Sequence, residues 1–278
     1  MLNNEEVKKI EDFVTEKPRS IQEIAEYLEV SWRTADRYVE QIETDLGTLQ
    51  TRVFRGGTRG ALKIVYLAGI EKVSHSVFQK QLEEQIFQAK RKEDFSAFDI
   101  FQHVEDKNKK ARLELASEED GTDLKEFVEH IQKTKKQALF FSGNLSFINL
   151  KNKKVDLMKV LEELAKKGVK MKVLCRVDLA GRENIERVLA LNFKYGKELV
   201  EIRHREHPIR ATIMDNQFFR IKEIKEPTGR LHELDKKVFI FYTIKDREWT
   251  EWLSRIFWKL FSQSVDANKR LEELNKIR

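Results

Sequence analysis

Residues 207–215, with the sequence HPIRATIMD, bring a His, an Arg and an Asp close together along the chain. These side chains suit phosphodiester chemistry, because an imidazole can attack phosphorus and a guanidinium can hold the phosphate oxygens. On a regular strand the two must stand two residues apart, since successive side chains alternate between its faces. His207 lies three residues before Arg210, so the two would face opposite sides. The segment raises two hypotheses: a phosphodiesterase or nuclease that uses His207 after a bulge at Pro208, or an anion-binding scaffold without catalysis.

The composition is that of a charged globular protein of one or two domains. The chain has 278 residues, of which 40% are hydrophobic and 36% charged. We expect a cytoplasmic protein without a membrane partner, because the sequence has no secretory signal and no run of about 20 apolar residues. The single Cys175 and six His show no metal-ligand spacing, so we expect no metal and no cofactor. Cys175 stands in an apolar run and is expected to be buried.

The net charge of +6 is unevenly distributed. Residues 137–278 carry 30 Lys and Arg against 20 Asp and Glu, whereas residues 1–70 carry 10 against 12. A basic surplus attracts nucleic acid, anionic surfaces or phosphorylated ligands without specifying which. The charge therefore ranks candidate partners and identifies none.

The first 70 residues predict a winged helix-turn-helix. Apolar spacing indicates helices at about 4–16, 21–28 and 32–46, with Ser20 and Glu23 as a capping box and Ser31 as the next N-cap. After Gly47 the apolar period changes to two, and TLQTRVF, RGGTRG and ALKIVYL indicate a β-hairpin.

A recognition helix and a basic wing would supply the DNA contacts of this module. Residues 30–65 hold six Lys and Arg against four Asp and Glu, the reverse of the balance in residues 1–29. A protein-binding winged helix with solvated charges is the alternative. The candidate DNA-binding residues are Ser31, Trp32, Arg33, Thr34, Arg37, Tyr38, Arg55 and Arg59.

Residues 71–136 predict a helical connector that packs on the flanking domains or dimerises with a partner chain, because their apolar stripe is too narrow to form a large core alone. Asp99 and His103 share a helical face there, and we expect them to be a solvated pair. Residues 137–262 predict an α/β domain that contains a parallel β-α-β unit, a helix at about 182–195, a hairpin over IRATIMD and FFRIKEI, and a closing apolar helix. Residues 263–278 predict a polar helix or tail.

Two family resemblances follow from these segments. SIQEIAEYLEVSWRTADRYVEQI resembles the winged helix-turn-helix of prokaryotic transcriptional regulators. QALFFSGNLSFIN, KKGVKMKVLCRV and VEIRHREHPIRATIMDNQFFRIKE look like the phospholipase D-like domain of archaeal TrmB-like regulators. The resemblance implies an α/β fold overall, with a winged helix-turn-helix, a helical connector and a phospholipase D-like α/β domain. The chain ends soon after the closing helix, so a sugar effector, which a further domain of such regulators binds, is not expected.

The catalytic pattern of the phospholipase D superfamily, H-x-K-x4-D, is incomplete. Arg210 and Asp215 keep the spacing of its Lys and Asp, but Pro208 stands at the position of the nucleophile. The resemblance therefore implies no enzyme and no catalytic residue. A phosphate, nucleotide or acidic effector could still bind, and a structural ion pair between Asp215 and Arg210 is the alternative. The candidate anion-binding residues are Ser142, Asn144, Arg176, His204, Arg210, Asp215 and Lys222.

The sequence favours a transcriptional regulator that binds double-stranded DNA. We expect it to act as a homodimer, and its inactive phospholipase D-like domain would bind a small anionic effector or mediate dimerisation. The alternatives are a phosphodiesterase or nuclease that uses His207, and an RNA- or protein-binding adaptor that acts mainly through the basic C-terminal domain.

Overall fold

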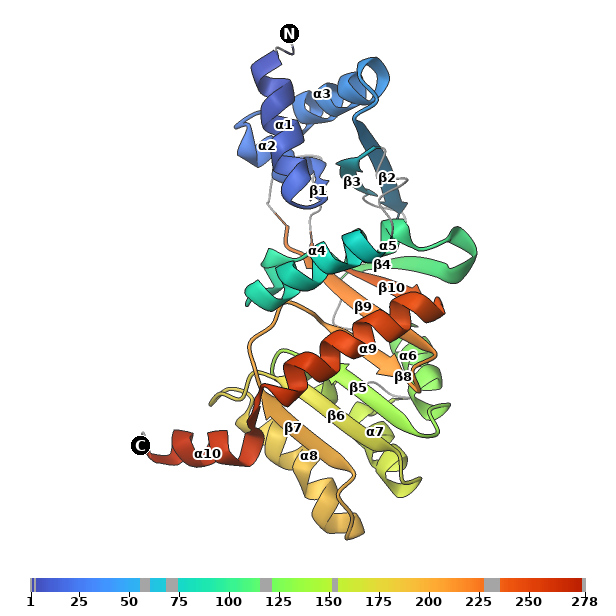
Figure 1. Ribbon diagram of the computed structural model, residues 1–278, viewed down its shortest axis with the longest axis vertical. Helices are drawn as coiled ribbons and strands as arrows, with labels where there is room; N and C mark the ends of the chain where they lie inside the picture. Colours follow the sequence, from blue (N-terminus) through green and yellow to red (C-terminus); the bar gives the residue numbers. More distant parts are fainter. Residues whose placement is uncertain are drawn as a thin grey trace.

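The computed structural model describes residue 2 and residues 4–55, 61–68, 75–115, 122–151, 155–227 and 236–276. Residues 4–68, as far as they are described, form an N-terminal module, and residues 75–276 form an α/β module built on a larger sheet (Figure 1). No helix within these ranges is both long and apolar enough to cross a bilayer.

The N-terminal module has three described helices and a three-stranded antiparallel sheet in the order β1-β3-β2. The capping box predicted between Ser20 and Glu23 begins the second helix, and the Ser31 side chain caps the third by accepting from the backbone N–H of Thr34. The elements are α1 (Asn4–Glu16), β1 (Arg19–Ser20), α2 (Ile21–Tyr27), α3 (Trp32–Asp45), β2 (Leu49–Arg55) and β3 (Ala61–Leu67).

In the α/β module, eight described strands form one mixed sheet in the order β11-β7-β6-β5-β8-β9-β10-β4. Strands β5, β6 and β7 are parallel and the other pairs are antiparallel, as the expected β-α-β unit and hairpin require. The strands are β4 (Lys109–Leu115), β5 (Gln137–Phe141), β6 (Lys170–Cys175), β7 (Val200–His204), β8 (Ala211–Met214), β9 (Phe218–Lys225), β10 (Val238–Ile244) and β11 (Val265–Asp266).

Helices cover both faces of this sheet (Figure 1). Side chains alternate along each strand, so Phe141 of β5 packs towards α4, α5 and α9 while its neighbour Phe140 packs towards α6, α7 and α8. The helices are α4 (His75–Gln88), α5 (Ala97–His103), α6 (Thr122–Gln132), α7 (Leu157–Lys166), α8 (Arg182–Tyr195), α9 (Arg247–Ser262) and α10 (Ala267–Lys276).

Two predictions for the connector are wrong. Lys109–Leu115 do not continue a helix but form β4, an edge strand paired with β10, because Ala111 and Leu113 alternate with charged side chains. Asp99 is not part of a solvated pair, since only 7% of it is exposed and burial raises the pKa of its carboxyl group. His103 instead packs its ring against Phe78, at 3.7 Å between centroids.

The N-terminal hairpin joins the core of the α/β module. Phe54 of β2 and Leu62 of β3 belong to the same buried cluster as Phe98 and Phe101 of α5, with the Phe54 and Phe98 ring centroids 6.1 Å apart. The Lys225 ammonium at the end of β9 also lies 3.0 Å from a carboxylate oxygen of Glu23 in α2. Apolar and ionic contacts therefore both connect the two modules.

Candidate anion-binding pocket and nucleic-acid surface

The carboxyl ends of β5 and β6 lie side by side and begin the candidate site. The backbone N–H of Ser142, directly after β5, donates to the carbonyl of Leu174 at 2.9 Å, and that of Arg176, directly after β6, donates to the carbonyl of Gly143 at 2.7 Å. These bonds hold the Ser142-Gly143-Asn144 turn beside Arg176. Open α/β sheets bind ligands at this edge of their parallel strands.

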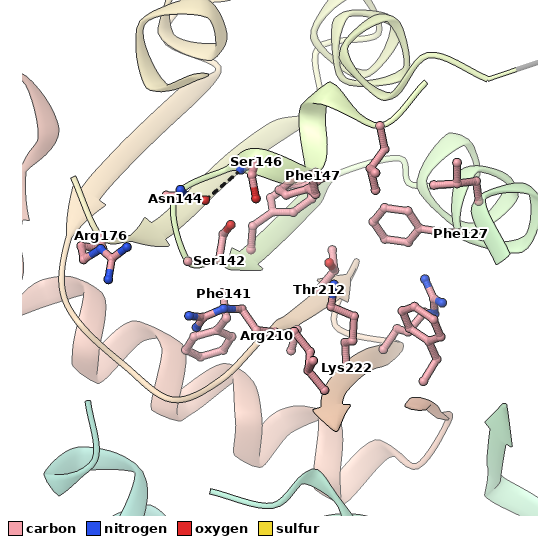
Figure 2. A pocket seen from close by; sticks show the side chains of 18 residues that line it. Phe127, Phe141, Ser142, Asn144, Ser146, Phe147, Arg176, Arg210, Thr212 and Lys222 are labelled. Carbon is pink, nitrogen blue, oxygen red and sulfur yellow. Dashed lines mark hydrogen bonds between the residues drawn. The ribbon is translucent and has the colours of Figure 1, made fainter. Parts of the chain in front are cut away.

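Strands β8 and β9 bring further cations to the same place. The backbone N–H of Lys222 donates to the carbonyl of Arg210 at 2.7 Å, so the residue before β8 lies against the middle of β9. Arg220 and Lys222 are two residues apart on β9 and therefore share one face of the sheet. Figure 2 shows Arg210 and Lys222 along one side of a pocket whose other side is formed by Ser142, Ser146 and Phe147.

This pocket, which we call the Arg210 pocket, has a volume of about 320 Å³. Its described lining includes four cationic side chains and no Asp or Glu. The lining residues are Leu124, Phe127, Phe140, Phe141, Ser142, Gly143, Asn144, Ser146, Phe147, Leu150, Arg176, Arg210, Ala211, Thr212, Arg220, Lys222, Ile224 and Phe241.

Burial and mutual repulsion disfavour the positive charges of the side chains that line the pocket. Burial, together with the neighbouring Arg220 and Arg210, lowers the pKa of Lys222 to about 8. Burial lowers the pKa of Arg220 to about 9, although the charge of Glu114 partly opposes that shift. The pKa of Arg210 is also lowered, mainly by burial and secondly by the positive charge of Arg176. An anion in the pocket would replace this mutual repulsion by attraction.

Gly143 allows the Arg210 guanidinium to lie across the turn after β5. A Cβ atom on Gly143 would stand 3.1 Å from one terminal nitrogen of Arg210 and 3.2 Å from its Nε. The guanidinium also donates to the carbonyls of His207 and Ile209, which fixes its position at the start of β8. A side chain at position 143 would therefore require the guanidinium to shift by a few tenths of an ångström.

A second cavity of about 540 Å³, the basic cavity, adjoins the Arg210 pocket. The two share Ser142, Gly143, Arg176 and Arg210 as lining residues. The basic cavity adds four cationic and two acidic side chains together with His207; its further lining residues are Lys90, Arg91, Lys92, Glu93, Arg205, Glu206 and His207. The charged end of the Arg210 pocket thus opens into a larger basic region.

His207 is buried and neutral. Only 3% of it is exposed, its Nε2 lies 3.0 Å from the carbonyl oxygen of Leu174, and its ring packs edge-on against Phe141. Burial, followed by the charge of Arg210, lowers the pKa of His207 to about 3. An imidazole fixed in this way has little freedom to reach a phosphate.

Two of the predicted anion-binding residues lie elsewhere. Asp215 accepts from the backbone N–H groups of Lys135, Lys136 and Gln137 at 2.8, 2.8 and 2.9 Å, at the opposite end of β8 from Arg210. The proposed ion pair between Asp215 and Arg210 is therefore wrong. His204 accepts from the backbone N–H of Val177 at 2.9 Å and lines neither of the two cavities.

The sequence interpretation missed Arg220 and the aromatic lining. The alternation of FFRIKEI places Arg220 on the face of Lys222, so the signal was present in the sequence. Phe127 and Phe147 come from α6 and from the segment after β5, and no local pattern connects them with β9. Of the predicted set, Ser142, Asn144, Arg176, Arg210 and Lys222 meet in the Arg210 pocket.

The candidate DNA surface lies on α3, at the end of the molecule away from the larger sheet (Figure 1). Arg33 and Arg37 are exposed on this helix, and Trp32 and Thr34 are half-buried. Tyr38, predicted on the exposed face, is only 6% exposed, because it lies three residues after the buried Ala35 on the same side of the helix.

The predicted wing contacts fall largely outside the described residues. Arg59 is not described, and for Arg55 only the backbone, at the end of β2, is described. Phe54 and Leu62, the neighbouring pair on the hairpin, pack into the α/β module. This end of the hairpin therefore points towards the larger sheet, and the DNA contacts predicted for it stay a prediction.

Comparisons with known proteins give distant structural similarities. No family model and no curated protein matches the chain. The chain is similar to Nuc from Salmonella typhimurium, a phospholipase D family member, with 16% identity over 57% of this chain and 97% of that one and a TM-score of 0.39. It is also similar to TrmBL2, an archaeal chromatin protein, with 16% identity over 95% and 93% and a TM-score of 0.39. NucT from Helicobacter pylori matches with 12% identity over 57% and 99% and a TM-score of 0.38. Similarities at this level assign no function to the chain.

Proposed function

We propose that this chain is a DNA-binding transcriptional regulator of the TrmB-like kind, whose phospholipase D-like α/β module binds a small anionic effector. The observation that carries the proposal is the pair of exposed arginines, Arg33 and Arg37, on the first turns of α3. Arginines at these positions of a recognition helix reach guanine edges or phosphates.

The order of elements supports this assignment of α3. The succession α1, β1, α2, α3, β2, β3, with β1 added to the edge of the hairpin, fits a winged helix-turn-helix in which α2 braces α3. Acidic residues on α3 are partly neutralised within the module, since Lys63 of β3 lies 2.7 Å from Asp36 and 3.0 Å from Glu40. The exposed surface at the start of α3 is thereby left basic.

The residues of HPIRATIMD favour a binding role over a catalytic one. Pro208 has no nucleophilic side chain, and His207 is buried, neutral and hydrogen-bonded to the backbone. The cations of the Arg210 pocket could still hold an anion without any bond being broken. We propose in addition that two copies pair, which would separate the two α3 helices by about one turn of DNA or a multiple of it.

The double variant Arg33→Ala/Arg37→Ala tests the DNA-binding role. Wild-type protein is first used to select its preferred duplex from a random pool, and affinity is then measured by fluorescence anisotropy at several salt concentrations. We expect the double variant to lose about 30-fold or more in affinity, because each arginine contact contributes roughly 1–3 kcal/mol. The salt dependence should also weaken, since fewer phosphate contacts release counterions.

The matched control is Arg247→Ala/Arg255→Ala, which removes the same charge from exposed positions of α9. This control should bind the selected duplex like the wild type. An unchanged affinity in Arg33→Ala/Arg37→Ala, or failure of the wild type to select any duplex, would remove the proposal.

A further inference from the structure

The Arg210 pocket has two chemically different ends. Ser142, Asn144, Arg176 and Arg210 form a polar and cationic end, where the pocket joins the basic cavity. The other end is mainly aromatic and also carries Arg220, and Figure 2 shows Phe127 at this end, across the pocket from Arg176. The apolar lining residues of the whole pocket are Leu124, Phe127, Phe140, Phe141, Phe147, Leu150, Ala211, Ile224 and Phe241. A ligand that fills the pocket must therefore combine an anionic group with an apolar body.

The aromatic rings at this end of the pocket pack against one another. Phe147 stacks on Phe140 with ring centroids 5.8 Å apart, and Phe127 stands edge-on to Phe147 at 6.4 Å. Arg220 lies 4.0 Å above the ring of Phe241 and 5.2 Å from that of Phe127. Flat aromatic bodies stack on such rings and on guanidinium planes, as bases do in nucleic-acid-binding proteins.

The positive charge of the pocket indicates that the ligand carries an anionic group. No carboxylate lines its described surface, and the charged side chains that act most strongly on Lys222 are all cations. Arginine and lysine side chains bind phosphate oxygens through charge-assisted hydrogen bonds. A volume of about 320 Å³ lies at the small end of the range for ligand pockets, so one phosphate and one compact flat body are sufficient to fill it.

We propose that the Arg210 pocket binds a nucleoside monophosphate, with the phosphate against Arg176 and Arg210 and the base against Phe127 and Phe147. This inference rests on the proposed function only for its effector-binding part. It adds the class of ligand and its orientation, with the phosphate towards the basic cavity.

Isothermal titration of the full chain tests this assignment. The probes are AMP, GMP, CMP and UMP, together with adenosine, inorganic phosphate, ribose 5-phosphate and a single-stranded tetranucleotide. We expect at least one nucleoside monophosphate to bind about tenfold more tightly than phosphate, ribose 5-phosphate or adenosine, because stacking on an aromatic ring contributes a factor of this size.

Two variants test the two ends of the pocket independently. Arg210→Gln should weaken the nucleotide and phosphate alike by about tenfold or more. Phe127→Leu should weaken the nucleotide by about tenfold and leave phosphate binding unchanged. Arg255→Gln, on an exposed position of α9, is the control for loss of charge and should bind like the wild type. Thermal unfolding checks that each variant is folded, and Lys222→Gln replaces Arg210→Gln if that variant does not fold.

Three results would overturn the ligand class. These are no binding by any monophosphate at millimolar concentration, equal affinity for monophosphates and ribose 5-phosphate, and tighter binding of the tetranucleotide than of its monomers. The last result would assign the pocket to a nucleic-acid strand. DNA affinity is measured on the same samples. A failure of nucleotide binding would then leave the DNA-binding proposal standing, because that proposal is tested only by the Arg33→Ala/Arg37→Ala variant.

Discussion

The surroundings of Lys222 support the proposed anion-binding site. Its ammonium group is half-buried, lies 4.7 Å from the ring of Phe239, and is surrounded mainly by other cations. Burial and like charge both favour the neutral amine, which is why its pKa is lowered to about 8. A bound phosphate would offset the repulsion from the neighbouring cations and would favour the protonated form of Lys222.

Nucleotide affinity should therefore fall as the pH rises past the pKa of Lys222. Between pH 7.5 and 9.0 the charged fraction of a group with a pKa of about 8 drops steeply, so AMP affinity should fall by about five- to tenfold. The phosphate itself keeps its charge in this range, because its second pKa is about 6. Titration calorimetry at each pH measures the effect.

The variant Lys222→Arg serves as the control for this pH dependence. A guanidinium stays charged in this range to a larger extent than the amine, so most of the loss should disappear. An equal loss in both proteins would assign the pH dependence to another group.

At the scale of elements, β9 connects the pocket with the N-terminal module. Its alternation directs Arg220 and Lys222 to the pocket, and Glu223 and Lys225 to the opposite face. There, Lys225 lies 3.0 Å from Glu23 of α2 and 3.2 Å from Glu223. One strand thus contributes side chains to both the proposed effector site and the contact with the N-terminal module.

Removing Lys225 should destabilise the protein strongly. Lys225→Met leaves Glu23 and Glu223 without their shared cation. Breaking a fully buried pair costs about 3–5 kcal/mol in the free energy of unfolding, which is the upper bound for this part-buried pair. Urea unfolding at pH 7 measures this cost, and Lys237→Met, which breaks an exposed pair with Glu226, should cost less than about 1 kcal/mol. Costs of similar size in the two variants would contradict the role of Lys225.

The ion pair between Glu23 and Lys225 also makes the free energy of unfolding depend on pH in the acid range. Burial alone would raise the pKa of Glu23, but Lys225 and hydrogen bonds from Ser20 lower it to about 2. The stabilisation from the Glu23 carboxylate is therefore present above its ordinary pKa near 4.5 and is lost as the pH falls towards 2. The difference in unfolding free energy between wild type and Glu23→Gln should shrink over this range.

Local patterns predicted most of the elements and part of the candidate site. The expected helix at 182–195 is α8, and the expected hairpin is β8 and β9, because their periodicities are local properties of the chain. The contact between Glu23 and Lys225 joins residues 202 positions apart, and no such pattern reports it. Tyr38 was misplaced although its spacing from Ala35 indicated burial. Strand β4 was missed because its short alternation follows a segment of helical spacing.

At the scale of the whole molecule, part of the N-terminal hairpin belongs to a core of the α/β module, while the helices of the N-terminal module pack around a core of their own. Phe54, Leu62 and Ile64 of the N-terminal hairpin are at most 7% exposed and pack in the cluster that contains Phe98 and Tyr242. Phe54 lies 6.1 Å from the ring of Tyr242. These contacts would be exposed to water if the modules were separated.

A fragment of residues 1–70 should therefore be less stable than the same residues in the full chain. Exposure of Phe54 and Leu62 would cost roughly 1.5–3 kcal/mol for each side chain. We expect the fragment to unfold at a lower temperature and to bind a hydrophobic dye, as measured by circular dichroism and fluorescence. A cooperative transition at the midpoint of the full chain, without dye binding, would contradict a shared core.

The anchored hairpin has a consequence for the spacing of DNA sites. Because Phe54 fixes β2 to the larger sheet, α3 cannot rotate freely relative to the rest of its own chain. A flexible linker would let α3 reach half-sites at different separations. In a pair of copies of this chain, the separation would be set by how the α/β modules meet, so inserting even a few base pairs between half-sites would misalign one of the two α3 helices.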